Sequence, residues 1–142
     1  MTIARLIEGR GNEIVSCASA TTVRDAVGIL AEKRIGAMPV IDGGEVVGIF
    51  SERDAVYQLA AHGAAMLERP VRDVMTAPAV TVTPATGVME ALALMTRRRF
   101  RHLPVVDNGR MIGFVSIGDL VKHRIDRIEA EAEAMRVYIQ SA

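Results

Sequence analysis

The chain has 142 residues, half of them apolar and 24% charged, which is typical of one compact folded domain rather than a disordered chain. Seventeen basic and seventeen acidic side chains cancel, so no overall charge draws the protein to nucleic acid or to an anionic membrane. No apolar stretch approaches the roughly 20 residues of a membrane-spanning helix, and no signal peptide is evident. The single cysteine, Cys17, is expected to be a buried core residue, and a cytoplasmic location is expected.

The first half of the chain predicts a strand, a helix, a hairpin and a second helix. Residues 14–18 are a short β-rich run, and the apolar residues of 23–30 recur at helical spacing. Residues 38–41 and 46–50 predict two strands, because the turn Asp42-Gly43-Gly44 between them tolerates the positive φ angles of a hairpin. A helix with an acidic start follows.

The second half of the chain repeats this pattern. A shift of 65 positions places residues 80–122 on residues 15–57 without a gap, and about a third of the pairs are identical. The repeated elements are a strand at 79–83, a helix with apolar residues at 88–95, and strands at 103–106 and 111–115. Each β-α-β-β-α copy is too small to bury its sheet alone. The sequence therefore predicts an α+β fold of two repeats packed sheet to sheet about a pseudo-twofold axis, plus a long C-terminal helix.

The repeat also predicts the organisation of the chain. Residues 1–62 form the first repeat with an N-terminal segment, and residues 77–124 form the second repeat. The intervening residues 63–76 contain Pro70 and are expected to be a linker. Residues 125–142 are predicted to extend the last helix beyond the second repeat.

The pattern Gly-x-x-Ser-x-x-Asp occurs once in each repeat, at 48–54 and at 113–119. The glycine permits close backbone approach, a hydroxyl and free amides at a helix start can bind a phosphate, and the aspartate can accept both hydroxyls of a ribose. Alternatively, Ser51 and Ser116 only cap their helices, and the two aspartates only complement the helix dipole. The residues by themselves leave both interpretations open.

These two strings, together with several other features, resemble a tandem pair of cystathionine β-synthase (CBS) domains. The other features are the proline-containing runs at 35–40 and 100–105, Val74-Met75-Thr76 before the second repeat, and the ungapped duplication. The resemblance covers nearly everything from Ile14 to Val121. It implies a regulatory module that binds an adenosine-containing ligand in two clefts, each assembled from both repeats.

The resemblance also implies which residues line each cleft. One cleft would combine Val15, Ile35, Gly36 and Ala37 with Phe114, Ser116 and Asp119. The other would combine Thr76, Val80, Phe100, Arg101 and His102 with Ile49, Ser51 and Asp54. In each cleft the aspartate would hold the ribose, and the residues from the other repeat would surround the adenine.

Basic residues distinguish the two predicted clefts. Residues 97–102 carry an arginine-rich cluster that the first repeat lacks. Arg101 and His102 are the predicted phosphate ligands within it, whereas its first two arginines suit a solvated helix end. Arg53 could reach a phosphate where the second repeat has Gly118. The sites should therefore differ in affinity or ligand; AMP is the first expectation and NAD(H) the second, with ATP, ADP and S-adenosylmethionine left open.

The C-terminal helix carries an apolar stripe with alternating steps of four and three residues. Its members are Val121, Ile125, Ile128, Ala132, Met135 and Ile139. The stripe could pack on its own domain, but a homodimer in which this helix supplements a larger interface is the favoured interpretation. CBS pairs commonly form dimers, which agrees with it.

The predicted function is that of a ligand sensor acting on a separate, unidentified protein partner, with no catalytic cofactor. An enzyme is not expected, because the three histidines, His62, His102 and His123, are scattered and no closely spaced metal-ligand set is present. A nucleic-acid-binding protein is the first alternative, although the zero net charge and five aromatic residues argue against it. A purely structural dimerisation module is the second alternative.

Overall fold

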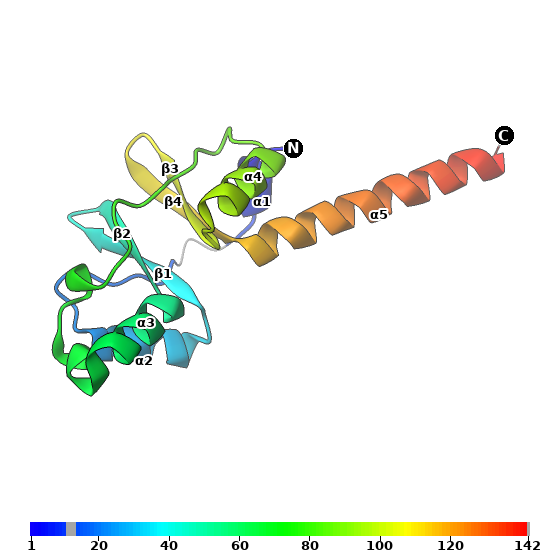
Figure 1. The fold of residues 1–142 in the computed structure, drawn as a ribbon. Helices are drawn as coiled ribbons and strands as arrows, with labels where there is room; N and C mark the ends of the chain where they lie inside the picture. The colour runs from blue at the N-terminus through cyan, green and yellow to red at the C-terminus, as the bar shows by residue number, and fades with distance from the viewer. Residues whose placement is uncertain (11–13, 142) are drawn as a thin grey trace.

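The computed structural model describes residues 1–10 and 14–141 and contains two copies of one helix-hairpin-helix arrangement. Residues 11–13 of the predicted first unit and Ala142 at the end of the predicted extension lie outside the described residues. The first copy comprises α2 (Val23–Lys33), β1 (Ala37–Asp42), β2 (Glu45–Ser51) and α3 (Glu52–His62). The second comprises α4 (Val88–Arg98), β3 (His102–Asp107), β4 (Arg110–Ser116) and α5 (Ile117–Ser141) (Figure 1).

Local chemistry explains where these elements begin and end. The Thr22 side chain accepts a hydrogen bond from the backbone N–H of Asp25 at the start of α2. Both α2 and α4 end at an arginine in the left-handed conformation, Arg34 and Arg99. The hairpin turns use positive φ angles at Gly43 and Gly44 and, in the second copy, at Asn108 and Gly109. The predicted helices and hairpins are therefore confirmed.

The two predicted leading strands are shorter than expected. Within residues 14–18 only Cys17 pairs, with Val40, and within residues 79–83 only Val82 pairs, with Val105. Each pairing is an isolated parallel bridge. The physical reason is the turn that follows at once, since Thr21 N–H already donates to the carbonyl of Ala18. The segment therefore crosses its hairpin at one residue instead of forming a ladder.

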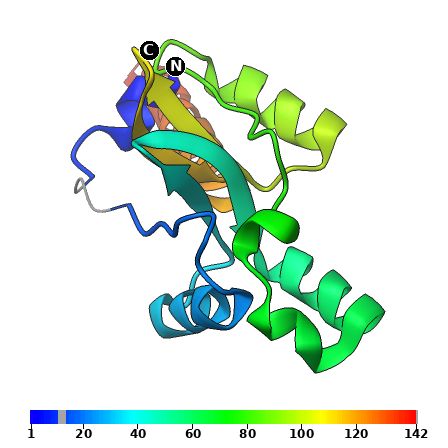
Figure 2. The ribbon, with the colours of Figure 1, turned by 90° about the vertical axis from the view of Figure 1, so that its left-hand side faces the viewer.

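Each copy has its own hydrophobic core, and the two hairpins lie between them. Phe50, Met38 and Val40 are fully buried in the first core, and Leu103 and Val105 in the second. Strands β2 and β4 contact each other across the middle of the molecule, which Figure 2 shows with the helices of the two copies on opposite sides. This arrangement confirms two repeats that meet through their sheets.

Cys17 belongs to the first core, as expected. Burial, together with the nearby charge of Asp42, raises the pKa of its thiol to about 11. The thiol is therefore protonated and unreactive at neutral pH.

The segments that precede each repeat pack on the other repeat. Helix α1 (Ile3–Ile7) contacts α5, and Ile3 is fully buried in the second core. Its N–H donates to the carbonyl of Thr86 at 2.8 Å. The sequence prediction assigned this N-terminal segment to the first repeat, because it precedes that repeat in the chain. In the structure, its apolar side chains pack in the core of the second repeat.

The predicted linker 63–76 is folded and belongs to the first core. It forms two 3-10 helices, η1 (Gly63–Glu68) and η2 (Val71–Asp73). Val71 is fully buried in the first core, and its N–H donates to the carbonyl of Thr21 at 2.7 Å. Val71 thus takes the place in the first repeat that Ile3 takes in the second.

The two repeated glycines accommodate these crossing segments. A Cβ atom at Gly48 would lie 2.7 Å from the sulfur of Met75, and one at Gly113 would lie 3.1 Å from the Ile7 side chain. The close approach that each glycine permits is therefore to a flanking segment of the chain.

Helix α5 packs on the second repeat only through its first turns and then leaves it. Leu120 is fully buried, but the stripe residues beyond it are exposed, from 42% at Val121 to 65% at Ile139. Figure 1 shows the helix extending away from the rest of the molecule. The stripe therefore does not pack on its own domain. Among the described residues, no helix is both long enough and apolar enough to cross a membrane.

The crossing of the N-terminal segment can be tested by truncating its buried side chain. Ile3→Ala should lower the free energy of unfolding by about 2 to 4 kcal/mol, because it leaves a cavity in the second core. Arg5→Ala, at an exposed position of the same helix, should change it by no more than about 0.5 kcal/mol. Urea unfolding followed by circular dichroism measures both. Equal effects of the two substitutions would contradict the packing of Ile3.

Candidate functional site

Two clefts open between the repeats, and each draws residues from both. We call them the Asp119 cleft and the Asp54 cleft, after the aspartate at each. The Asp119 cleft has a volume of about 640 Å³ and the Asp54 cleft one of about 280 Å³. Ligand sites of small molecules fall in or near this range.

The Asp119 cleft contains all seven residues predicted for it. The connection between α2 and β1 supplies Ile35 and Gly36, the start of β1 supplies Ala37, and the segment before Cys17 supplies Val15. On the opposite side lie Phe114 and Ser116 of β4 and Asp119 in the first turn of α5. Apolar side chains thus line one part of the cleft, and a hydroxyl and a carboxylate line the other.

The Asp54 cleft contains all nine residues predicted for it, Arg53 included. The first repeat contributes the end of β2 and the start of α3, and the second contributes the end of α4 and the start of β3. Its residues are Ile49, Ser51, Arg53, Asp54, Thr76, Val80, Phe100, Arg101 and His102. The sequence therefore predicted which side chains the fold brings together; that they bind a ligand stays a prediction.

The serine and aspartate of each string cap a helix. Ser51 accepts a hydrogen bond from Asp54 N–H at 3.2 Å, and the Asp54 carboxylate accepts from Ser51 N–H at 2.9 Å. Ser116 and Asp119 make the same pair of bonds, at 3.1 and 2.8 Å. Both serine–aspartate pairs therefore cap their helices in the structure. Capping does not prevent the aspartate from also binding a ribose, because a carboxylate has about four acceptor positions.

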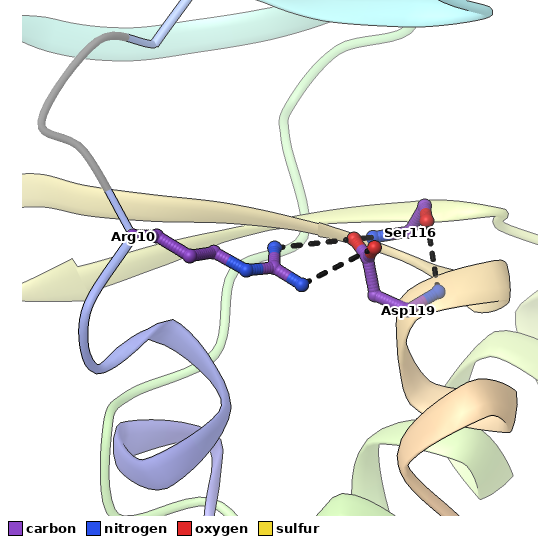
Figure 3. Close-up of polar contacts among 3 residues, drawn as sticks. All are labelled: Arg10, Ser116 and Asp119. Atoms are coloured by element: carbon purple, nitrogen blue, oxygen red, sulfur yellow. Dashed lines mark hydrogen bonds and ion pairs between the residues drawn. The ribbon is translucent and has the colours of Figure 1, made fainter.

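The Asp119 carboxylate has an additional partner that the sequence did not suggest. Arg10, just after α1, places its Nη1 3.3 Å from Oδ2 and its Nη2 3.2 Å from Oδ1 of Asp119 (Figure 3). Burial tends to raise the pKa of Asp119, but the hydrogen bonds from Ser116 and Arg10 outweigh it and hold the pKa below its usual range. Asp119 is therefore ionised at neutral pH and neutralised by Arg10.

The Asp54 carboxylate has a neutral neighbour instead. The hydroxyl of Thr76 donates to its Oδ1 at 3.2 Å. Thr76 also pairs with Ile49 through backbone hydrogen bonds of 2.9 Å in both directions, which fixes the segment against β2. The two aspartates thus differ in the charge of the flanking segment that contacts them.

His102 lines both clefts. Its ring stacks on Phe114, with centroids 5.5 Å apart and planes 12° from parallel. Burial lowers its pKa, and the positive charge of Arg101 adds to the effect, although Asp119 and Glu52 oppose it. The ring is therefore mainly neutral at pH 7 and forms an aromatic wall shared by the two clefts.

Positive charge gathers in the Asp54 cleft. Arg53, Arg99 and Arg101 line it, and the predicted phosphate role of Arg101 is compatible with this position. The first two arginines of the cluster do not line either cleft; the guanidinium of Arg98 lies 6.0 Å from the centre of the Phe100 ring. No group of three or more histidine, cysteine or acidic side chains that could hold a metal is found in the described part of the chain.

Sequence reasoning missed Arg10 and Ile7 in the Asp119 cleft, and Arg99, Tyr57 and Glu52 in the Asp54 cleft. A signal for Ile7, though not for Arg10, was present. At a shift of 68 positions, the apolar residues of 3–7 fall on those of 71–75. The shift of 65 that aligns the repeats hides this match. Arg99 belongs to the arginine-rich cluster 97–102, but only Arg101 and His102 of that cluster were assigned to a phosphate. Tyr57 carried no signal, since a single tyrosine in an exposed helix has no pattern of its own.

Comparison with known proteins agrees with this architecture. The sequence model of the CBS domain matches residues 11–61 and again residues 71–126. The chain is 35% identical over 148 aligned positions to the CBS domain-containing protein CBSX3 of Arabidopsis thaliana, covering 98% of this chain and 72% of that one. That relative is named as mitochondrial, so it lends no support to a cytoplasmic location.

Solved structures share the fold. The CBS-domain containing protein ATU1752 from Agrobacterium tumefaciens is 38% identical, with a TM-score of 0.83 over 87% of this chain and 99% of that one. CBSX2, of which the compared structure is a complex with AMP, is 29% identical, with a TM-score of 0.73 over 88% and 96% of the two chains. A family match over most of the sequence and this shared fold lead to one conclusion: the chain belongs to the CBS domain family and carries two CBS domains in tandem.

Proposed function

We propose that this protein is a regulatory module that binds an adenine nucleotide, with AMP as the first candidate, between its two CBS domains. The observation that carries the proposal is the sorting of the predicted residues into two clefts, each with an apolar part and a carboxylate. The complex of CBSX2 with AMP supports the choice of ligand.

Each part of a nucleotide has a suitable partner in the clefts. Asp54 or Asp119 accepts hydrogen bonds from the ribose hydroxyls, since an ionised carboxylate is an acceptor only. In the Asp119 cleft, Val15, Ile35 and Phe114 offer the apolar surface that an adenine ring requires. In the Asp54 cleft, Arg53 and Arg101 are placed for a phosphate.

The charges of the Asp54 cleft rank the candidate ligands. Arginines favour AMP, ADP, ATP and NAD(H), which carry phosphates, over S-adenosylmethionine, whose sulfonium is positive. AMP ranks first among these phosphorylated ligands because it is the ligand in the compared CBSX2 complex. NAD(H) remains the second candidate.

Regulation follows from the position of the clefts between the domains. A ligand that contacts both repeats stabilises the arrangement in which both sets of contacts are made, and so shifts the conformational equilibrium. A separate protein partner would detect this shift. The protein is proposed to act as a homodimer, because the apolar stripe of α5 is exposed on a single chain.

Isothermal titration calorimetry with the refolded, ligand-free protein tests the proposal. AMP should bind with micromolar affinity, and Asp54→Asn and Asp119→Asn should each weaken one site by roughly 1 to 3 kcal/mol, about 5- to 150-fold, because each removes a charged acceptor. Asparagine retains an oxygen for the helix cap, so the fold should persist.

The matched control is Asp25→Asn, which removes an exposed acid at the same position of helix α2, outside both clefts. It should leave the titration unchanged. Unchanged affinity in both cleft variants would refute the site assignment. Absence of binding to AMP, ATP, NAD and S-adenosylmethionine would refute the sensor function. In that case, a salt-dependent gel shift with RNA or DNA would favour the nucleic-acid-binding alternative. The absence of a gel shift would favour the alternative of a purely structural dimerisation module.

A further inference from the structure

The N-terminal segment brings a permanent positive charge into the Asp119 cleft. Of the described residues that line this cleft, Arg10 is the one arginine or lysine, whereas the Asp54 cleft has three arginines. Helix α1 anchors the segment in the second core through the buried Ile3, so Arg10 is held close to the cleft. Its side chain is 43% exposed and that of Asp119 is 33% exposed.

Arg10 and the Ser116 amide together use most of the acceptor capacity of Asp119. Oδ2 accepts from the Ser116 N–H at 2.8 Å and from Nη1 of Arg10 at 3.3 Å, and Oδ1 accepts from Nη2. Since a carboxylate oxygen has two acceptor positions, one position remains, on Oδ1. Both hydroxyls of a ribose therefore cannot bind Asp119 while Arg10 keeps its two contacts.

We infer that Arg10 is an exchangeable counter-ion that makes the Asp119 cleft selective for phosphorylated adenosine ligands. This inference rests on the proposed function. When ribose hydroxyls occupy Asp119, Arg10 leaves the carboxylate and pairs with the phosphate of the same ligand. Exposed ion pairs are weak, so the contact is readily exchanged. The planar guanidinium fork binds phosphate in the same two-point manner as it binds a carboxylate.

This exchange distinguishes ligands by their charge. When AMP displaces Arg10 from Asp119, its phosphate becomes the new negatively charged partner of Arg10. Adenosine displaces Arg10 but offers it no anion. S-adenosylmethionine also offers no phosphate, and it adds a second positive charge. The Asp54 carboxylate also has three acceptor positions occupied, by the N–H and hydroxyl of Ser51 and the hydroxyl of Thr76, but these donors are all neutral. A ribose that displaces one of them leaves no unpaired charge, so the Asp54 cleft should not select ligands in this way.

Titrations of AMP and adenosine at the Asp119 cleft test the inference. They are made in an Asp54→Asn background, so that the remaining tight site is the Asp119 cleft. Arg10→Ala should weaken AMP about tenfold or more, through loss of a charged contact, and should leave adenosine unchanged or bound more tightly. The ratio of the two affinities should therefore fall at least about tenfold. Arg10→Lys should give an intermediate ratio, because it keeps the charge without the fork.

Arg5→Ala, in the exposed part of α1, is the matched control and should leave the ratio unchanged. Thermal unfolding checks that the Arg10 variants keep the fold, which is expected at an exposed position. If AMP and adenosine both bind and their ratio is the same with and without Arg10, the inference is wrong although the proposed function stands. If AMP does not bind even with Asp54 and Arg10 in place, the proposed function fails and the inference with it.

A separate observation concerns helix α5, whose charges specify a partner. Residues 124–141 are exposed along their whole length, so the apolar stripe has no partner within the described part of this chain. The stripe residues occupy the a and d positions of a heptad, with Ile125 at a and Ile128 at d. Arg124 and Glu131 then occupy g positions, and Glu129 and Arg136 occupy e positions.

These e and g residues are complementary in a parallel pair of identical helices. The g position of one helix faces the next e position of the other, so Arg124 meets Glu129 and Glu131 meets Arg136 of the second copy. In the antiparallel pairing that keeps the whole stripe in contact, Glu129 would face Glu129 and Glu131 would face Glu131. We propose that α5 pairs in parallel and in register with α5 of a second copy of this chain.

Cysteine cross-linking distinguishes the orientations. Met135→Cys places a thiol at a d position, which faces its own copy only in the parallel, in-register pair, so oxidation should link most chains as dimers. Ala130→Cys, on the opposite side of the helix, should give little dimer. Sedimentation at micromolar concentration should give a dimer for the unmodified chain. A monomer, or equal linking of the two variants, would overturn the proposal.

Discussion

The face that each hairpin cannot bury by itself determines the architecture. A two-stranded antiparallel sheet has two faces, and in each repeat two helices and a crossing segment cover one of them. The other face meets the second hairpin, through β2 and β4. Where this contact ends at the strand termini, the clefts open. The sites are thus a consequence of joining two incomplete sheets, and each cleft necessarily contains residues of both repeats.

The crossing segments tie the two halves into one unit. Residues 1–7 complete the second core and residues 69–75 complete the first, through matching backbone hydrogen bonds. The order of the segments in the chain therefore differs from the way they pack. Each repeat needs a segment from outside its own sequence range to complete its hydrophobic core. The same segments reach the aspartates of the clefts, through Arg10 on one side and Thr76 on the other. Core packing and site electrostatics therefore depend on the same residues.

Much of this was predictable because the duplication preserves local chemistry. Helical spacing, turn residues and caps predicted both hairpins and all four helices of the repeats, and the family resemblance predicted how the cleft residues sort. The strands predicted at residues 14–18 and 79–83 were too long. β propensity does not reveal that a turn begins at Ala18 and ends the pairing of the first one. Arg10 was missed because its position depends on long-range packing of Ile3, which no local pattern specifies. The exposure of α5 likewise depends on what surrounds a helix, and a heptad pattern by itself does not reveal that.

The duplication is symmetric in backbone but not in charge, and this difference bears on the proposed function. The Asp54 cleft concentrates arginines near its aspartate, whereas the Asp119 cleft is larger and has Arg10 already paired. His102 and Gly36 line both clefts, so the two proposed sites share part of their lining. For the proposed function, two sites that share a wall and differ in charge are expected to differ in affinity and to influence each other. Any coupling between them must be reciprocal, since each ligand changes the affinity of the other by the same factor.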